Sequence, residues 1–182
     1  MTITFGFYNS VANDRVYDAV QLSKMFNGIL TDGVFKLIGD KFQVTQNTGM
    51  AIIVKSGKAW FNNTWTLNDS NFGLIIANSD LILPRIDTVV LEINAALASR
   101  TNTIKVITGT PNAVPVPPTL TNTAELHQYP LAYVSVSAGA TSIVNANITQ
   151  LVGTVNCPYV VFPEPLIAPS DAADVLKVQI FT

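Results

Sequence analysis

Charge is the feature that this sequence has least of. Charged residues make up 12% of the 182 residues, against about 25% in typical globular domains. The 58 residues between Lys105 and Glu164 carry a single formal charge, Glu125. Charged side chains normally keep surfaces solvated and monomers apart. We therefore expect this surface to be covered by other protein chains, or kept soluble by neutral Thr, Asn and Ser, which favours a building block of an assembly over a free enzyme.

Cysteine, long apolar runs and basic clusters are also scarce. Cys157 is the sole cysteine, so the chain has neither an internal disulfide nor a thiolate metal cage. Mean hydropathy is +0.35, yet no apolar run reaches the roughly 18 residues of a membrane span. The segment Met1–Gly6 does not resemble a signal peptide. A net charge of −2 supplies no cationic stripe, so we expect neither membrane insertion nor nucleic-acid binding.

Catalytic and metal-binding motifs are absent from the sequence. The carboxylates are scattered singly, without a spacing typical of acid–base pairs or metal ligands. Asp69 and Asp80 are the weak candidates for glycoside hydrolysis, which needs two carboxylates across a sugar, but solvated loop residues are the simpler interpretation. His127 fits a structural hydrogen bond, and Cys157 a small buried hydrophobe. We predict no enzyme activity, no catalytic residues, no metal and no cofactor.

Short apolar runs separated by Asn, Gly and Ser clusters are typical of a β-sandwich or barrel. The expected strands are Phe42–Val44, Met50–Val54, Lys58–Phe61, Thr64–Leu67, Leu74–Ala77 and Leu81–Leu83. The fold class predicted is mainly β (α+β): a β-sandwich-like domain with one N-terminal amphipathic helix and an extended C-terminal arm.

The strongest hairpin signal joins a long strand, Ile86–Ala95, to a second strand, Thr103–Thr108. Strand alternation places Asp87 on one face with three aliphatic residues, Val89, Leu91 and Ile93. Arg85, two residues earlier, lies where it can pair with Asp87. A further strand is expected after Pro130, through Leu131 and Val136.

Two segments show helical spacing. Val16, Val20, Met25, Phe26 and Ile29 recur on one face, with Asn13 or Asp14 as cap and Gly28 as stop. We expect this helix to cover the open face of a sheet rather than to bind a membrane surface or a partner. Residues 145–152 are interpreted as a second, short helix.

Proline dominates two other segments. Pro111, Pro115, Pro117 and Pro118 fall within eight residues, which predicts extended, polyproline-like chain. After Cys157 a Pro-rich arm leads to a terminal strand with little charge, so the domains predicted are residues 1–157 and 158–182. The terminal strand either adds to the sheet edge of a neighbouring subunit or closes its own sheet. The candidate subunit-interface residues are Pro115, Pro117, Pro118, Tyr133, Val175, Val178, Ile180 and Phe181.

Trp60, Phe61 and Trp65 cluster around the Asn62–Asn63 turn. Alternation places Trp60 and Phe61 on opposite faces of their strand. Burial in the core or in a subunit interface is the first interpretation, because aromatic residues dominate both. Stacking on the sugar rings of a glycan is the alternative.

Five stretches taken together resemble the N-terminal module of structural proteins associated with baseplates and receptor-binding proteins in tailed phages and prophages of Gram-positive bacteria. They are Asp18–Ile29 with Thr31–Phe35, Ser56–Trp65, Arg85–Glu92, Gly109–Pro111 with Pro115–Pro118, and Tyr129–Val134. The similarity covers roughly residues 1–157. About 25 residues follow Cys157, which leaves little room for the variable receptor-binding part that this family often carries.

The resemblance implies a non-enzymatic adaptor at a phage tail tip, located in the virion and assembled in the cytoplasm of the host bacterium. It implies other tail or baseplate proteins as partners, and a homo-oligomer, with a trimer as the family-based expectation. The alternative function is a carbohydrate-binding, receptor-recognition module of a tail protein, with a glycan of the host cell wall as its ligand.

Overall fold

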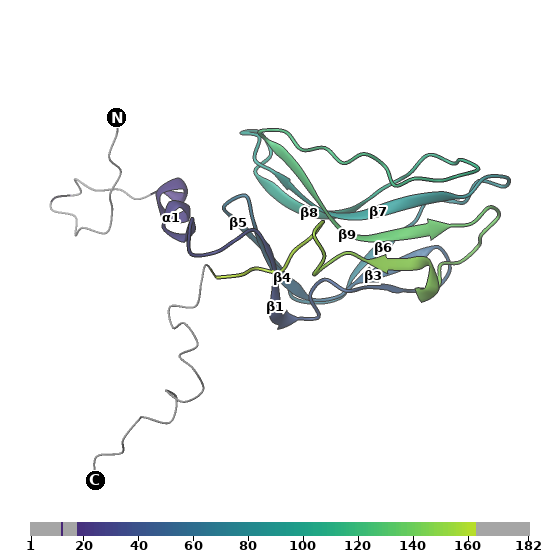
Figure 1. Ribbon diagram of the computed structural model, residues 1–182, viewed down its shortest axis with the longest axis horizontal. Coiled ribbons are helices and arrows are strands. Elements are labelled where there is room, and N and C mark those ends of the chain that lie inside the picture. Colours follow the sequence, from purple (N-terminus) through teal and green to yellow (C-terminus); the bar gives the residue numbers. More distant parts are fainter. Residues whose placement is uncertain (1–11, 13–17, 163–182) are drawn as a thin grey trace, which may run out of the picture. The chain divides into compact units, whose positions relative to one another are not determined.

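The described part of the chain, residues 12 and 18–162 of the computed structural model, is built mainly from antiparallel strands (Figure 1). The sheets have the strand orders β10-β9-β7-β8, β1-β4-β5 and β2-β3-β6. The strands are β1 (Gly33–Gly39), β2 (Val44–Gln46), β3 (Ala51–Val54), β4 (Gly57–Phe61), β5 (Thr64–Asn68), β6 (Phe72–Ile75), β7 (Arg85–Asn94), β8 (Thr101–Ile107), β9 (Leu126–Val136) and β10 (Ile148–Gln150). The mainly β fold expected from the sequence is confirmed.

One short α-helix, α1 (Ala19–Phe26), precedes the strands in the described residues. Asp18 caps it: its carboxylate accepts a hydrogen bond from the Gln21 backbone N–H (2.8 Å), and the Gln21 side chain accepts one from the Asp18 N–H (3.2 Å). The expected caps, Asn13 and Asp14, lie outside the described residues. Because this capping box sets the start at Asp18, α1 has about two turns rather than four.

The chain divides into two units, of which residues 32–160 form one. The other unit contains α1, and none of the eight helix residues is buried. The prediction that this helix covers a sheet is therefore not confirmed. The helix also ends before Ile29, which was expected on its apolar face. Gly28, at φ +91°, marks the stop as predicted.

In the unit of residues 32–160, the four-stranded sheet packs against the two three-stranded sheets. One core cluster contains Val89, Leu91 and Ile93 of β7 together with Phe61 of β4 and Ile52 of β3. Aliphatic residues from β1, β2 and β9 belong to the same cluster. Apolar side chains from both layers therefore fill one interior, which is the packing of a β-sandwich.

The alternation predicted for β7 is confirmed. Val89, Leu91 and Ile93 face the core, and Asp87 is fully buried at the same side of the strand. Arg85 donates from Nε to Asp87 Oδ1 at 2.9 Å, as its spacing predicted. A buried carboxylate needs such a partner, because an unpaired charge in the interior costs several kcal/mol.

The other face of β7 is buried as well. Thr88 and Val90 point away from the core cluster, yet neither is exposed. The connection of residues 109–125 covers this face, because its ends are anchored at opposite ends of β7. The Asn112 N–H donates to the Pro84 carbonyl before β7, and the Thr121 N–H donates to the side chain of Gln128, which pairs with Glu92. Figure 1 shows this connection running lengthwise beside β7 and β8.

Two of the predicted elements are wrong. Residues 145–152 do not form a helix: a 3-10 turn, η1 (Asn145–Asn147), leads into β10, which pairs with the free edge of β9. Leu81–Leu83 is not a strand, because the Asp80 carboxylate accepts the N–H groups of Ile82 and Leu83, both at 2.8 Å. This local turn removes two backbone donors that a strand would need. The other predicted strands are present within a few residues of their expected ends, but β9 begins before Pro130 and β1 was not predicted.

Candidate functional site

The structure separates the three aromatic candidates. Phe61 is buried in the core, where its ring stacks on Tyr129 with 3.9 Å between centroids. Trp60 is also buried, whereas 63% of Trp65, directly opposite it on β5, is exposed. Phe61 and Trp60 face opposite sides of β4, as predicted. Phe61 is therefore a core residue that no glycan can reach, and Trp65 is the aromatic side chain available for contact.

The Asn62–Asn63 turn between β4 and β5 is confirmed. Both residues have positive φ angles, 48° and 59°, which asparagine tolerates better than most residues. The Tyr129 hydroxyl donates to Asn62 Oδ1 at 2.8 Å and so ties β9 to this turn. Burial first, and then the nearby Asp32 carboxylate, raises the pKa of Tyr129 to about 12. The tyrosine is a neutral structural link between the two layers.

Four of the predicted interface residues lie on the outer side of the four-stranded sheet. Pro115, Pro117 and Pro118 belong to the covering connection and are half-buried. Tyr133 is opposite Thr88 in the β7–β9 pairing, so it points to the same side and is also half-buried. The remaining four, Val175, Val178, Ile180 and Phe181, lie outside the described residues.

Two exposed residues on the outer side of the four-stranded sheet were not among the interface residues predicted from the sequence. Val114 and Val116 alternate with the prolines and are 78% and 67% exposed. In extended chain, neighbouring side chains point in different directions. When the prolines pack inward, the valines must therefore point outward. The sequence shows the alternation Val-Pro-Val-Pro, but it does not show whether the prolines or the valines pack inward.

A large part of the uncharged stretch lies on this side of the unit. The connection of residues 109–125, β9 and β10 all come from it, and Thr149 of β10 is exposed next to Tyr133. We call the connection, together with the outward side chains of β9 and β10, the neutral face. Glu125 is its one charged residue within the stretch. The low charge of this part of the sequence is therefore a property of one surface of the folded unit.

One ion pair borders the neutral face. Lys105 of β8 binds Glu92 of β7, and Gln128 of β9 donates to the same carboxylate oxygen at 2.7 Å. Burial opposes ionisation of Glu92, but the hydrogen bonds from Lys105 and Gln128 outweigh it and lower the pKa of Glu92. These charges are neutralised locally and fix the strands in register.

Asp80 and Cys157, two of the titratable residues considered for catalysis, have structural roles. Asp80 uses its carboxylate in the turn to Leu83, whose backbone N–H, followed by that of Ile82, lowers the pKa of Asp80. Burial raises the pKa of Cys157 to about 12, so the thiol is a poor nucleophile at neutral pH. Among the residues that the structure describes, no group of three His, Cys, Asp or Glu side chains could hold a metal.

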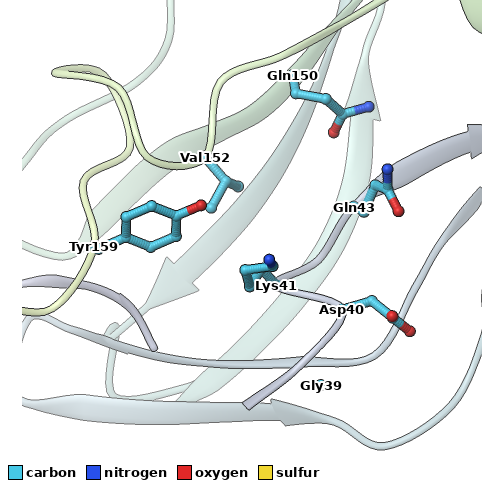
Figure 2. A pocket seen from close by; sticks show the side chains of 7 residues that line it. All are labelled: Gly39, Asp40, Lys41, Gln43, Gln150, Val152 and Tyr159. Carbon is cyan, nitrogen blue, oxygen red and sulfur yellow. The ribbon is translucent and has the colours of Figure 1, made fainter. Parts of the chain in front are cut away.

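A polar hollow of about 280 Å³ lies between the β1–β2 turn and β10. Figure 2 shows Lys41, Gln43 and Tyr159 around it. The Gln150 side chain donates to the Val44 carbonyl at 2.6 Å and accepts from its N–H at 3.0 Å, which blocks the edge of β2. The Gln150 amide therefore completes the backbone pairing of β2 and is not free for a ligand.

Comparisons with protein-family models, with curated proteins and with solved structures give no match for this chain. Within the described residues, no helix has the length and apolar character needed to cross a membrane.

Proposed function

We propose that this chain is a non-enzymatic structural protein that joins subunits of a phage tail baseplate or tail tip. The observation that carries the proposal is the neutral face, on which Val114 and Val116 are exposed and Glu125 is the one formal charge between residues 106 and 163. Specific interfaces are depleted of charge at their centres and enriched in apolar and aromatic side chains. The neutral face has this composition.

The neutral face also has the rigidity that an interface needs. The connection is anchored by backbone hydrogen bonds at Asn112 and Thr121, and its prolines restrict the backbone between them. Rigid extended chain loses little conformational entropy when a partner covers it. A partner that covers the connection and the outward side of β9 should bury at least about 1,000 Å² in total.

Strand addition is the second proposed contact. Val175–Phe181 is apolar apart from Lys177 and Gln179, which suits pairing with a sheet edge of a neighbouring subunit. In the described residues, β6 is an edge strand that bonds to β3 alone, and it contains no charged residue. Natural edge strands are usually protected by charge, proline or a covering segment. An uncharged edge favours β6 as the acceptor.

The assignment to a phage tail rests on the resemblance of residues 1–157 to the baseplate-associated module. It makes other tail proteins and sister copies the partners, with a trimer as the expected homo-oligomer, and the virion as the final location. The sandwich and its neutral face support an adaptor, because both features serve contact between proteins.

The test is the oligomeric state of the full chain, measured by native mass spectrometry and light scattering at micromolar concentration. We expect a defined oligomer for the wild type. A double variant, Val114→Glu with Val116→Glu, should shift it to monomer, because two charges would have to be desolvated in the interface. Leu97→Glu, a change of the same kind at an exposed residue of the β7–β8 turn, is the matched control and should leave the oligomer intact.

A wild-type chain that stays monomeric and does not bind the other tail proteins when co-expressed with them would overturn the proposal. Circular dichroism of each variant shows whether the sandwich is retained, so that loss of assembly is not confused with unfolding. Electron microscopy of the assembled particle then shows whether the neutral face is covered.

A further inference from the structure

A second hollow, of about 440 Å³, lies where the edge strand β5 meets the β7–β8 hairpin. Its lining residues come from β5 and from both strands of that hairpin next to the turn: Thr64, Trp65, Ile93, Asn94, Ala95, Arg100 and Asn102. The volume falls within the roughly 300–1,000 Å³ of small-molecule sites. The lining combines an exposed aromatic ring with amides, a hydroxyl and a guanidinium, and it contains no carboxylate.

The amide of Asn102 is held in one orientation. Its Nδ2 donates to Thr66 Oγ1 at 2.8 Å, to Thr64 Oγ1 at 3.1 Å and to the Trp65 carbonyl at 3.3 Å. The donors of the amide are thereby used, and Oδ1 accepts no hydrogen bond from the residues that the structure describes. The amide therefore ties β5 to β8 and fixes the strand that carries Trp65.

One cation lies over the Trp65 ring, and a second lines the hollow. The Lys58 ammonium lies 5.9 Å from the centre of the indole ring. Arg100 lines the hollow, and its guanidinium forms no ion pair or hydrogen bond with the described residues. A guanidinium without a carboxylate partner favours binding of an anion, which it can contact through two parallel hydrogen bonds.

We propose that this hollow binds a saccharide that carries a negative charge, as a uronate or a phosphate. The indole of Trp65 stacks on the apolar face of one sugar ring, and Arg100 binds the anionic group. A nucleic acid is disfavoured, because it needs a longer basic stripe than one Arg and one Lys. The site lies outside the neutral face and does not depend on the proposed assembly function.

The test uses the full chain and two-dimensional NMR of the Trp65 indole N–H. The probes are trigalacturonate, glucose 6-phosphate and, as the neutral comparison, maltotriose. We expect saturable shifts of the Trp65 signal, with at least tenfold weaker binding of maltotriose than of the better anionic probe. Raising the salt concentration should weaken the anionic probes alone. Binding of only one anionic probe would support the proposal and identify which anion is recognised.

Variants separate the roles. Trp65→Ala should reduce binding of every probe more than tenfold, and it should fold normally because the side chain is mostly exposed. Arg100→Gln should weaken the anionic probes about tenfold and leave maltotriose unchanged. Lys41→Gln, in the other hollow, is the matched control for charge and should change nothing.

The proposal fails if no probe shifts the Trp65 signal at tens of millimolar. It also fails if the neutral sugar binds as well as the anionic ones, or if Trp65→Ala binds like the wild type. Melting curves of the variants exclude unfolding as the cause of a loss.

Discussion

The buried pair of Arg85 and Asp87 gives the sharpest stability prediction. Asp87 is fully buried and accepts three hydrogen bonds: from Arg85 Nε at 2.9 Å, from Arg85 Nη2 at 3.2 Å and from the Gly109 N–H at 2.8 Å. Arg85 also donates to the carbonyls of Ala77 and Asn78. The pair therefore joins β7 to the segment after β6 and to the start of the covering connection.

Asp87→Asn changes one atom, so it removes the charge without opening a cavity. The Arg85 guanidinium, which is almost fully buried, would be left without its anion. Loss of one partner from a buried pair costs about 3–5 kcal/mol. This is a large fraction of a typical domain stability of about 5–15 kcal/mol. We expect the free energy of unfolding, measured by urea titration with circular dichroism at pH 7, to fall by that amount.

A double-mutant cycle with Arg85→Gln isolates the coupling between the two side chains. We expect the two single changes to be non-additive by about 1–3 kcal/mol, because they share one interaction. Asp69→Asn, a loop carboxylate that is exposed, is the control and should stay within about 0.5 kcal/mol of the wild type. A loss below about 1 kcal/mol for Asp87→Asn, or strict additivity, would refute the reasoning.

Three further predictions follow from buried groups. Thr88→Val should leave stability unchanged or raise it by about 1 kcal/mol, because the buried Thr88 hydroxyl has no hydrogen-bond partner among the described residues; a clear loss in urea titration would show that the hydroxyl is bonded. The Cys157 thiol should react with a disulfide reagent at pH 8 far more slowly in the native than in the urea-unfolded chain, since its pKa is raised from 9.0 to about 12; equal rates would contradict its burial. The same shift means that the unfolded chain releases this proton first as pH rises. The stabilisation from Cys157 is therefore complete below pH 9 and falls by about 1.4 kcal/mol per pH unit towards pH 12; Cys157→Ala should flatten that fall in pH-dependent unfolding, and an equal slope in both proteins would exclude this cause.

Local patterns in the sequence predicted most of the β structure. The alternation in Ile86–Ala95, the Asn62–Asn63 turn and the Arg85–Asp87 spacing each depend on residues a few positions apart, where strand geometry dictates which side chains meet. Residues 145–152 were misjudged because Ile148 and Leu151 fit a helical face. Pairing with the edge of β9 decided that segment, and tertiary pairing overrides local propensity.

The candidate sites were harder to predict. Trp60, Phe61 and Trp65 are all aromatic residues close to the same turn in the sequence. Only their packing in the structure shows that one of them remains available to a ligand. The hollow beside Trp65 also needs Arg100 and Asn102, which come from a different strand pair. No local pattern links residues that the fold brings together from more than thirty positions apart.

The sequence by itself determined that this protein is rich in strands, poor in charge and without a recognisable catalytic motif, because composition and period-two alternation are properties of neighbouring residues. The tertiary structure alone decided that the connection of residues 109–125 covers one side of the four-stranded sheet, with Val114 and Val116 outward and Pro115 and Pro117 half-buried. The physical reason is that burial depends on what covers a strand. Here the cover is the 109–125 connection, whose ends bond to opposite ends of β7.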